Sequence, residues 1–312
     1  MDKLDYKILE ILDWDARMPL TAIAKATKSN KDVVAYRINR LHEEGIIVRY
    51  FPVLDMHKLG YHTSRLYLDL EEMDPKQEME FIAFLDQQIN AGMIFRMDYP
   101  YRYGIVVWVT SVYEIEKIIE NIKKKLGRTL IKYNHSLICT FRQYPKDYLF
   151  NIKEHSENLT LQPGEKVDYD KEDFIILKEL AKDARVSSAQ IARSLKIPQT
   201  TVSHKLRLLE KKKVILGYRA EIDISRLGYI NYFLEIYLDD NSVLPKIESW
   251  ADMHKNVVWL QKIIGTCDIE IEVEVHDRQE LETLLNELRG RFKEIRKIVF
   301  WSQNYKKLTF LP

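Results

Sequence analysis

Apolar side chains recur at helical spacing in two separate regions of the chain. Residues 4–12 and 174–180 each carry an apolar stripe on one face of a short helix. A second short helix is expected near 19–26 and near 187–194, and a third helix follows each of them. The inward stripe of the third helices is predicted to be Val34, Ile38 and Leu41 in the first region and Val202, Leu206 and Leu209 in the second.

After each third helix the apolar pattern changes to a strand period. Residues 46–54 and 214–222 are alternating or continuously apolar, which predicts β ribbons. Gly45 is expected to end the first of the third helices, whereas the second has Lys213 there and its glycine only at Gly217. Three helices followed by a two-stranded ribbon predict a winged helix-turn-helix, whose third helix is shaped to enter the DNA major groove.

The rest of each region follows the order strand, helix, strand, strand, helix, strand. That order is typical of a ferredoxin-like (βαββαβ) sandwich, and its last strands are expected at 131–141 and 298–303. The predicted fold class is therefore α+β. We expect winged helix-turn-helix domains over residues 1–55 and 167–223, ferredoxin-like domains over 56–145 and 224–312, and a polar linker over 146–166.

The two regions are copies of one another. Residues 15–61 align with 183–229 at a constant offset of 168, and 14 of the 47 pairs are identical. The matches include Asp-Ala-Arg at 15–17 and 183–185, Tyr50 with Tyr218, and Leu-Gly-Tyr at 59–61 and 227–229. A repeat this long indicates two copies of one folded unit, so we expect a pseudo-dimer on one polypeptide.

Composition and cysteine content indicate the type of protein and the cellular compartment. The hydrophobic content is 46%, and the chain has two cysteines, Cys139 and Cys267, far apart in apolar runs. Neither a disulfide framework nor a metal site is expected, and a reducing cytoplasm is predicted. The amino terminus does not read as a secretion signal and no run approaches the length of a membrane span, so no membrane partner is expected.

Several short motifs are similar to those of one family of prokaryotic transcription factors. They are Asp-x-x-Ile-Leu at 5–9, the two Asp-Ala-Arg triplets, residues 37–47, and the Leu-Gly-Tyr leading into each sandwich. The chain resembles, twice over, the leucine-responsive and asparagine-operon regulators (Lrp/AsnC). The resemblance implies a sequence-specific regulator that binds double-stranded DNA. It also implies that the ferredoxin-like (RAM-type) domains pair protomers and bind small effectors, often amino acids.

The turn between the middle strands of the second sandwich reads Gly265-Thr266-Cys267-Asp268. It is similar to the family's glycine and aspartate pattern, which implies effector binding by Gly265, Thr266 and Asp268. A plain tight turn is the alternative explanation. In the first sandwich residues 99–102 read Tyr-Pro-Tyr-Arg, so an equivalent site is not expected there.

Charge distinguishes the two winged units. The whole chain is nearly neutral at +1. Residues 1–50 hold nine basic and eight acidic side chains (+1), whereas residues 167–219 hold twelve basic and seven acidic ones (+5). Because phosphate contacts supply most of the non-specific affinity for DNA, the second unit is predicted to bind more strongly.

With the apolar stripes facing inward, other side chains of the third helices and ribbons remain for DNA. Asp32 would repel phosphate in the first unit, and a merely solvated helix face is the alternative for each candidate. The predicted DNA-binding residues are Lys31, Tyr36, Arg37, Arg40, Arg49, Gln199, Thr200, Ser203, His204, Lys205, Arg207 and Arg219.

Two alternatives stay open. Siroheme decarboxylases resemble the same architecture, and the nearest analogue here of their histidine and arginine set is residues 95–103 with His135. The second alternative is a metabolite-sensing scaffold without DNA binding. Because the sequence has no phosphate-cradling glycine loop, nucleophile elbow or metal-spaced cluster, no catalytic residue, cofactor or metal is predicted.

Overall fold

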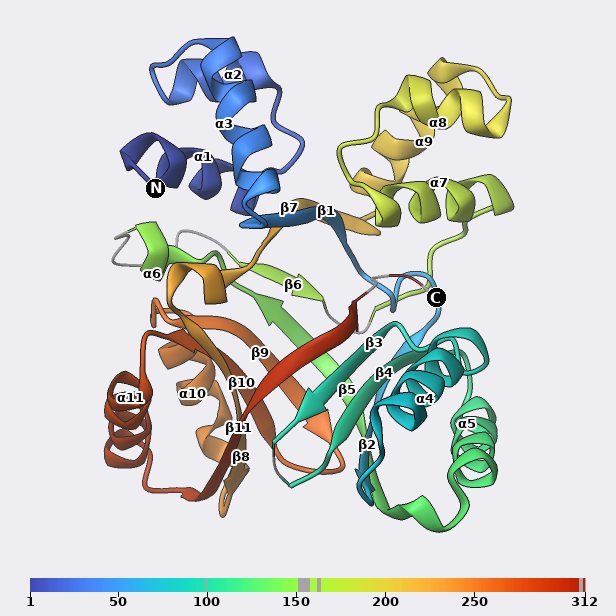
Figure 1. Cartoon of the computed structure of the whole chain (residues 1–312), viewed down its shortest axis with the longest axis vertical. Helices are drawn as coiled ribbons and strands as arrows, with labels where there is room; N and C mark the ends of the chain where they lie inside the picture. Colours follow the sequence, from blue (N-terminus) through green and yellow to red (C-terminus); the bar gives the residue numbers. More distant parts are fainter. Residues whose placement is uncertain (99, 151–157, 162–163, 309–310, 312) are drawn as a thin grey trace.

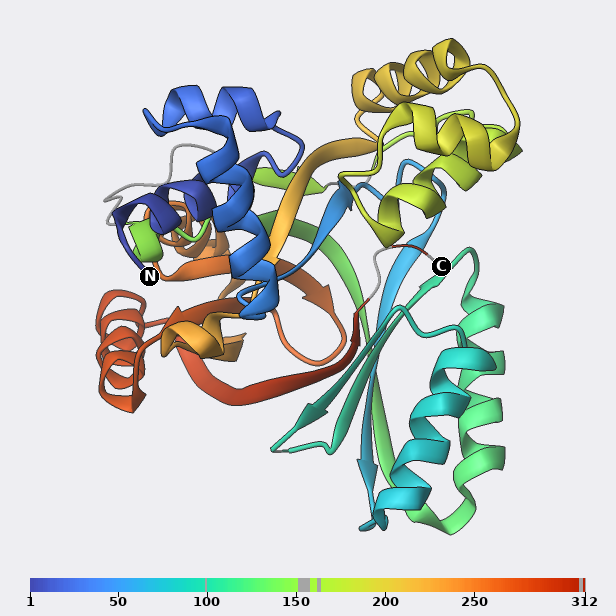
Figure 2. The same cartoon turned by 45° about the horizontal axis from the view of Figure 1, so that its top comes forward.

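The computed structural model describes all residues except 99, 151–157, 162–163, 309–310 and 312, and only the backbone of 303–308. Two three-helix heads stand on one side of a large closed sheet (Figures 1 and 2). The first head comprises α1 (Lys3–Trp14), α2 (Leu20–Ala26) and α3 (Lys31–Glu43); the second comprises α7 (Lys171–Lys182), α8 (Ser188–Leu195) and α9 (Gln199–Lys211).

The heads form where the sequence predicts helices. Asp2 and Asp170 cap α1 and α7 through capping boxes with Asp5 and Asp173, which satisfies backbone donors at each helix start. Asn30 caps α3 by accepting from the backbone amide of Asp32. The predicted stripes are buried in both heads, which confirms them: Val34, Ile38 and Leu41, and Val202, Leu206 and Leu209.

The predicted two-stranded ribbon within each unit is wrong. Each unit supplies a single strand, β1 (Ile47–Leu54) or β7 (Ile215–Ile222), and the two strands pair antiparallel with each other. The physical reason is that these strands are apolar along most of their length. A free wing would leave one face in water, whereas in the paired ribbon most residues of β1 are buried and every residue of β7 is buried or half-buried.

Each head docks on the strand of the other unit. The amide of Ala16 donates to the carbonyl of Tyr218 (2.8 Å), and the amide of Ala184 donates to that of Tyr50 (3.1 Å). Arg17 donates to the Ala184 carbonyl (2.9 Å), and Arg185 to the Ala16 carbonyl (2.6 Å). The Asp-Ala-Arg and Tyr identities of the repeat are therefore the reciprocal contacts of this ribbon.

Below the ribbon lie two ferredoxin-like units, which confirms the predicted α+β fold. The first consists of β2 (His62–Leu70), α4 (Pro75–Gln87), β3 (Met93–Met97), β4 (Tyr103–Val109), α5 (Val112–Leu126) and β5 (Leu130–Gln143). The second consists of β8 (Ile230–Leu238), α10 (Leu244–Ala251), β9 (Val257–Ile264), β10 (Ile269–Val275), α11 (Arg278–Arg291) and β11 (Ile295–Leu308).

The last strand of each unit is long enough to serve both sheets. β5 pairs with β2 through residues 130–138 and with β9 through 137–143, and β11 pairs with β8 and then with β3. The order β2-β4-β3-β11-β8-β10-β9-β5 closes because β2 also pairs with β5. The result is a barrel whose helices α4, α5, α10 and α11 cover the outside (Figure 1).

The segment predicted as a linker, 146–166, is partly folded. It contains α6 (Asp147–Phe150) and β6 (Leu159–Leu161), which pairs with β5. Tyr148 and Leu149 are buried against the second ferredoxin-like unit because an apolar run follows Lys146 in an otherwise polar stretch. Among the described helices, none combines the length and apolar character that crossing a membrane requires.

The ends of α3 and α9 differ from the prediction at one residue. Gly45 has a φ of 68°, and Lys213 takes the same left-handed conformation with a φ of 59°. Gly217 therefore does not end α9; it lies within β7. A lysine in this conformation carries a steric cost because its Cβ approaches the following carbonyl oxygen.

Lys213→Gly is expected to raise the free energy of unfolding by about 0.5–1 kcal/mol, since glycine adopts a positive φ without that cost. Urea unfolding of the full chain measures it. The reciprocal variant Gly45→Lys is expected to lower stability by a similar amount. An unchanged or lower stability for Lys213→Gly contradicts this explanation.

Candidate nucleic-acid interface and internal cavity

Several predicted DNA-contacting residues lie on the outer surface of the third helices. On α9, Gln199, Thr200, His204 and Arg207 are exposed and Ser203 is half-buried. On α3, Lys31 is exposed and Tyr36 is 65% exposed, which is high for an aromatic side chain. Both heads therefore present side chains outward from the helix that a winged helix-turn-helix inserts into DNA.

Three predicted DNA-binding cations, of which Arg37 and Lys205 were expected at phosphates, are held in ion pairs within their own head. Arg37 contacts Asp2 (2.6 Å) and Asp5 (3.1 Å), and the equivalent Lys205 contacts Asp170 (2.5 Å) and Asp173 (3.2 Å). Arg40 likewise contacts Asp5 (2.6 Å). These pairs join the third helix to the capped start of the first, so a phosphate at any of the three cations would compete with a carboxylate.

The prediction that Arg219 contacts DNA is wrong. Its side chain is 3% exposed and forms an ion pair with Asp13 at 2.7 Å. It also donates to the backbone carbonyls of Asp13 and Tyr144. Arg49 is half-buried and paired with Glu221 on the neighbouring strand. Both were expected on a free wing, whereas the ribbon packs against α1 and α7, and Arg219 reaches the backbone just after β5.

The predicted effector turn lies between β9 and β10. Gly265 has a φ of 134°, and a Cβ there would lie 2.5 Å from the carbonyl oxygen of His135 on β5. Asp268 accepts a hydrogen bond from the backbone amide of Leu238 (2.8 Å). Gly265 and Asp268 thus have structural roles, and effector binding by them and Thr266 stays a prediction. In the corresponding first-unit turn, Tyr99 lies outside the described residues.

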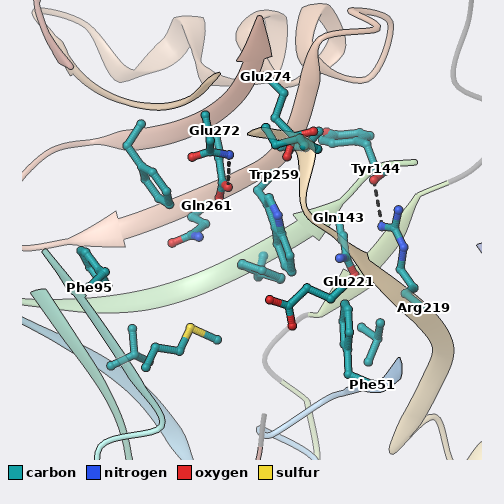
Figure 3. Close-up of a pocket in the computed structure, with 18 of the residues that line it drawn as sticks. Phe51, Phe95, Gln143, Tyr144, Arg219, Glu221, Trp259, Gln261, Glu272 and Glu274 are labelled. Atoms are coloured by element: carbon teal, nitrogen blue, oxygen red, sulfur yellow. Dashed lines mark hydrogen bonds between the residues drawn. The ribbon is translucent and has the colours of Figure 1, made fainter. Parts of the chain in front are cut away.

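Between the ribbon and the open end of the barrel lies a cavity of about 890 Å³ (Figure 3). Aromatic rings including Phe51, Phe95 and Trp259 form part of its wall. Six carboxylates and four arginine or lysine groups also line it. This cavity was not predicted from the sequence. The alternation Ile-Glu-Ile-Glu-Val-Glu-Val of β10 could have indicated it, because all of these residues are buried and the glutamates therefore face the inside of the barrel and not solvent.

The three inward glutamates of β10 have different partners. Glu270 is ion-paired with buried Arg65 and accepts from Tyr67 (2.7 Å). Glu274 is ion-paired with Lys146 (2.5 Å) and accepts from Tyr148.

Glu272 lies between Glu270 and Glu274 and accepts from the Asn231 amide (2.6 Å). Burial and, secondarily, Glu274 raise the pKa of Glu272 to about 8. On β8, burial and then Glu270 raise the pKa of Glu235 to about 7.

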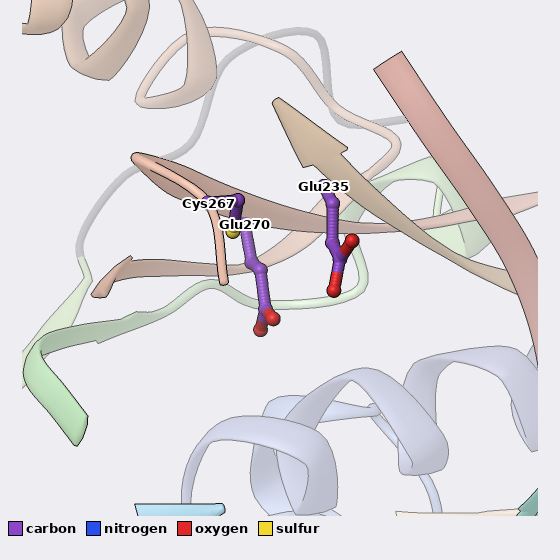
Figure 4. A group of neighbouring side chains, drawn as sticks. All are labelled: Glu235, Cys267 and Glu270. Carbon is purple, nitrogen blue, oxygen red and sulfur yellow. The ribbon is translucent and has the colours of Figure 1, made fainter. Parts of the chain in front are cut away.

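One group of potential metal ligands occurs among the described residues. Donor atoms of Glu235, Cys267 and Glu270 lie within 4.8 Å of one another (Figure 4). Glu270 is already paired with Arg65, and burial raises the pKa of the Cys267 thiol so that it stays protonated at neutral pH. The chemistry of this group does not favour a cation.

Comparison with known proteins identifies the heads. A family model for winged helix-turn-helix DNA-binding matches twice, at residues 1–48 and 170–215. An uncharacterized HTH-type transcriptional regulator of Pyrococcus horikoshii is 31% identical over 139 residues, which are 44% of this chain and 87% of that protein. This chain belongs to the HTH-type transcriptional regulators of the Lrp/AsnC family. The regulator LrpC of Bacillus subtilis is 23% identical, covering 42% of this chain and 91% of LrpC.

The regulator is a DNA-binding protein whose winged helix-turn-helix heads provide the interface. Each of these relatives accounts for less than half of it. A solved structure matches it along nearly its whole length: the siroheme decarboxylase NirDL has a TM-score of 0.63 at 14% identity, covering 99% of this chain and 94% of that one. At this identity the likeness shows a shared fold.

Arg219→Ala is expected to lower the free energy of unfolding by about 3–5 kcal/mol, because it leaves Asp13 buried without its counter-charge. Arg207→Ala, on the exposed face of α9, is the control and is expected to change stability by less than about 0.5 kcal/mol. Urea unfolding measures both. Similar stabilities for the two variants would contradict the burial of the Arg219 pair.

Stability is expected to fall as pH rises towards 8. The pKa of Glu235 is raised to about 7 and that of Glu272 to about 8, from an ordinary value of 4.5. The folded chain therefore holds protons that the unfolded chain releases, and the associated stability is present below pH 4.5 and is lost as pH rises through 7 and 8.

Urea unfolding of the regulator and of a Glu235→Gln, Glu272→Gln double variant, each at pH 5.5 and 8.5, measures this dependence. The double variant is expected to gain stability relative to the parent chain as pH rises. If the difference in the free energy of unfolding between the two proteins is the same at pH 5.5 and pH 8.5, the pKa values of Glu235 and Glu272 are not raised.

Proposed function

We propose that this regulator arose by tandem duplication of a single regulator gene and reads an asymmetric DNA site with two unequal heads. The observation that carries the proposal is the difference between α9 and α3. The exposed surface of α9 offers Gln199, His204 and Arg207, which can bond base edges or phosphate. The surface of α3 offers Lys31 and Tyr36 beside the exposed carboxylate of Asp32.

Net charge also indicates that the second head binds DNA more strongly than the first. The second unit carries +5 over residues 167–219 and the first carries +1 over residues 1–50. Two heads that lie side by side fit half-sites about one helical turn apart, near 34 Å between centres. The second head then supplies most of the affinity, and the first adds a weaker contact to the neighbouring groove.

Replacing Gln199, Ser203 and His204 together by alanine is expected to weaken specific DNA binding at least tenfold more than replacing Lys31 and Tyr36. Fluorescence anisotropy at one fixed salt concentration, with a site selected from genomic DNA, measures both losses. Equal losses would contradict unequal heads. The thermal stability of each variant serves as the control, because these positions lie outside the buried stripe.

A small metabolite, such as an amino acid, is the proposed effector, and the cytoplasm its setting. The turn at Gly265, Thr266 and Asp268 is one proposed site, supported by its likeness to the family pattern. Because Gly265 also packs against β5, a bulky substitution there would disturb the barrel. Thr266→Ala is the more informative variant, and loss of an amino acid response with unchanged stability would support this site.

A tetrapyrrole enzyme is the second candidate, favoured by the internal cavity and by the whole-length fold likeness to NirDL, one structure of which holds an iron-uroporphyrin III analogue. Arg96 of the predicted tetrapyrrole set lines the cavity, whereas His135 bonds Ser64 at 2.8 Å. Carboxylates outnumber cations along the wall, which disfavours a macrocycle bordered by carboxylates.

Adding siroheme anaerobically is expected to leave its visible spectrum unchanged by the regulator. Serum albumin, which binds many porphyrins non-specifically, serves as the comparison for non-specific shifts. A saturable spectral shift at equimolar protein, followed by loss of carbon dioxide from the macrocycle, would establish the enzyme and overturn the expectation.

A further inference from the structure

We propose that the internal cavity is a binding site for an organic ammonium ion with an apolar body, in which Glu272 is the counter-charge, Asn231 accepts a further ammonium proton, and Gln143 accepts from a donor elsewhere on the ligand. The site differs from the effector turn at Gly265. The claim does not depend on DNA binding.

The backbone register places these side chains next to one another. Glu272 on β10 lies opposite Phe233 on β8 and opposite Trp259 on β9, and Trp259 in turn lies opposite Gln143 on β5. One row across the inner face of the barrel therefore reads Phe233, Glu272, Trp259 and Gln143. Figure 3 shows the last three of these at the cavity with their side chains directed into it.

Among the described residues, no arginine or lysine forms an ion pair with Glu272, in contrast to the two glutamates next to it on the inner face of β10. Glu270 and Glu274, two residues away on either side, are ion-paired with Arg65 and Lys146. The carboxyl of Glu272 accepts a hydrogen bond from the neutral side-chain amide of Asn231. A buried carboxylate without a counter-charge is costly, so an incoming cation at this position would be strongly favoured over one in water.

Two buried acceptors in the wall of the cavity, one next to Glu272 and one beyond Trp259, have no hydrogen-bond partner among the described residues. They are Oε1 of Gln143, whose residue is 4% exposed, and Oδ1 of Asn231. Both residues line the cavity. Buried oxygens without donors lose much of the hydrogen-bonding energy they had in water. A ligand that serves both the Glu272 carboxylate and the adjacent Asn231 oxygen must bring at least two donors on one positively charged atom, and a primary ammonium does so.

The walls around this polar group are aromatic. The rings of Phe233 and Trp259 flank Glu272 in the same row, and Phe141 lies beside Gln261 in the next. Aromatic faces attract an ammonium ion and also accommodate an alkyl or aryl body. The apolar part of the ligand would extend towards Phe51 and Phe95, which also line the cavity.

The charged groups around Glu272 disfavour an amino acid as the ligand. They are Glu270 and Glu274 on β10, Glu235 on β8, Arg65 on β2, Lys146 after β5, and the Arg219–Asp13 pair at the ribbon. All three cations are held in ion pairs, so a ligand carboxylate would find no unpaired partner among them. The inferred ligand is an amine without an acid group.

Binding is linked to a proton. Burial raises the pKa of Glu272 to about 8, so at neutral pH its carboxyl is mostly protonated. A protonated amine that docks against it displaces that proton to solvent and leaves a carboxylate paired with an ammonium ion. Affinity is therefore expected to rise between pH 6.5 and 8.5, with release of close to one proton per amine at pH 7.

The cavity also borders the β1–β7 ribbon, which carries the heads. Phe51 and Val53 of β1 and Glu221 of β7 line the cavity on its ribbon side. These strands connect both heads to the barrel, so an amine in the cavity contacts the elements that set the position of the heads.

Isothermal titration calorimetry of the full chain with 2-phenylethylamine, hexylamine and 1,5-diaminopentane tests the proposal. 2-Phenylethanol and phenylacetate are the matched neutral and anionic probes. The expected result is saturable binding of at least one amine, no binding of the two matched probes, and a heat that varies between buffers of different ionisation enthalpy by the release of about one proton.

Glu272→Gln is expected to weaken that amine at least tenfold and to abolish the proton release, while the chain stays folded because a neutral amide of similar shape replaces a mostly protonated carboxyl. Glu282→Gln, on the exposed face of α11, is the control and is expected to leave binding unchanged. Gln143→Leu provides a second variant with an expected loss of several-fold. Failure of all three amines to bind at millimolar concentration, equal binding by Glu272→Gln, or preference for phenylacetate overturns the proposal.

Discussion

The architecture depends on backbone pairing between the two halves of the chain. A ferredoxin-like sheet alone leaves the outer edge of its second strand, β3 or β9, with unpaired amides and carbonyls. Here each of these edges is covered by the extended last strand of the other half, β11 or β5. Since exposed strand edges favour association with other chains, this exchange satisfies both edges within one molecule. The β1–β7 ribbon joins the heads in a similar way, because each half of the chain supplies one of its two strands.

This exchange fixes the two heads relative to one another. Each head packs on the strand of the other unit through the Asp-Ala-Arg turn, so neither is attached by a flexible tether. The two halves share the contacts that hold them together, while their outward helix surfaces differ. The closed barrel also creates an interior that a single unit would lack, and charged groups from both halves meet there.

Periodicity and the internal repeat were sufficient to predict the helices, the strand order and the α+β fold. They did not show which strands pair between units, because pairing depends on contacts far apart in sequence. The sequence pattern of residues 46–54 and 214–222 is the same whether they form two wings or one shared ribbon, and Arg219 was predicted to contact DNA for that reason. Strands β5 and β11 were predicted too short because most of their final residues are polar. These residues are strands only because they pair with β9 and β3 of the other half.

The candidate site was predictable in part. The outward positions of α9, such as Gln199 and His204, follow from helical geometry. The ion pairs of Arg37 and Lys205 were not anticipated, since the helix-capping aspartates that hold them are about 30 residues away. The measurement that tests the account most directly is sequencing of genomic DNA bound by the intact regulator. A sharp motif with two unequal half-sites about one helical turn apart is the predicted result, and a perfectly palindromic motif or no enriched sequence would contradict it.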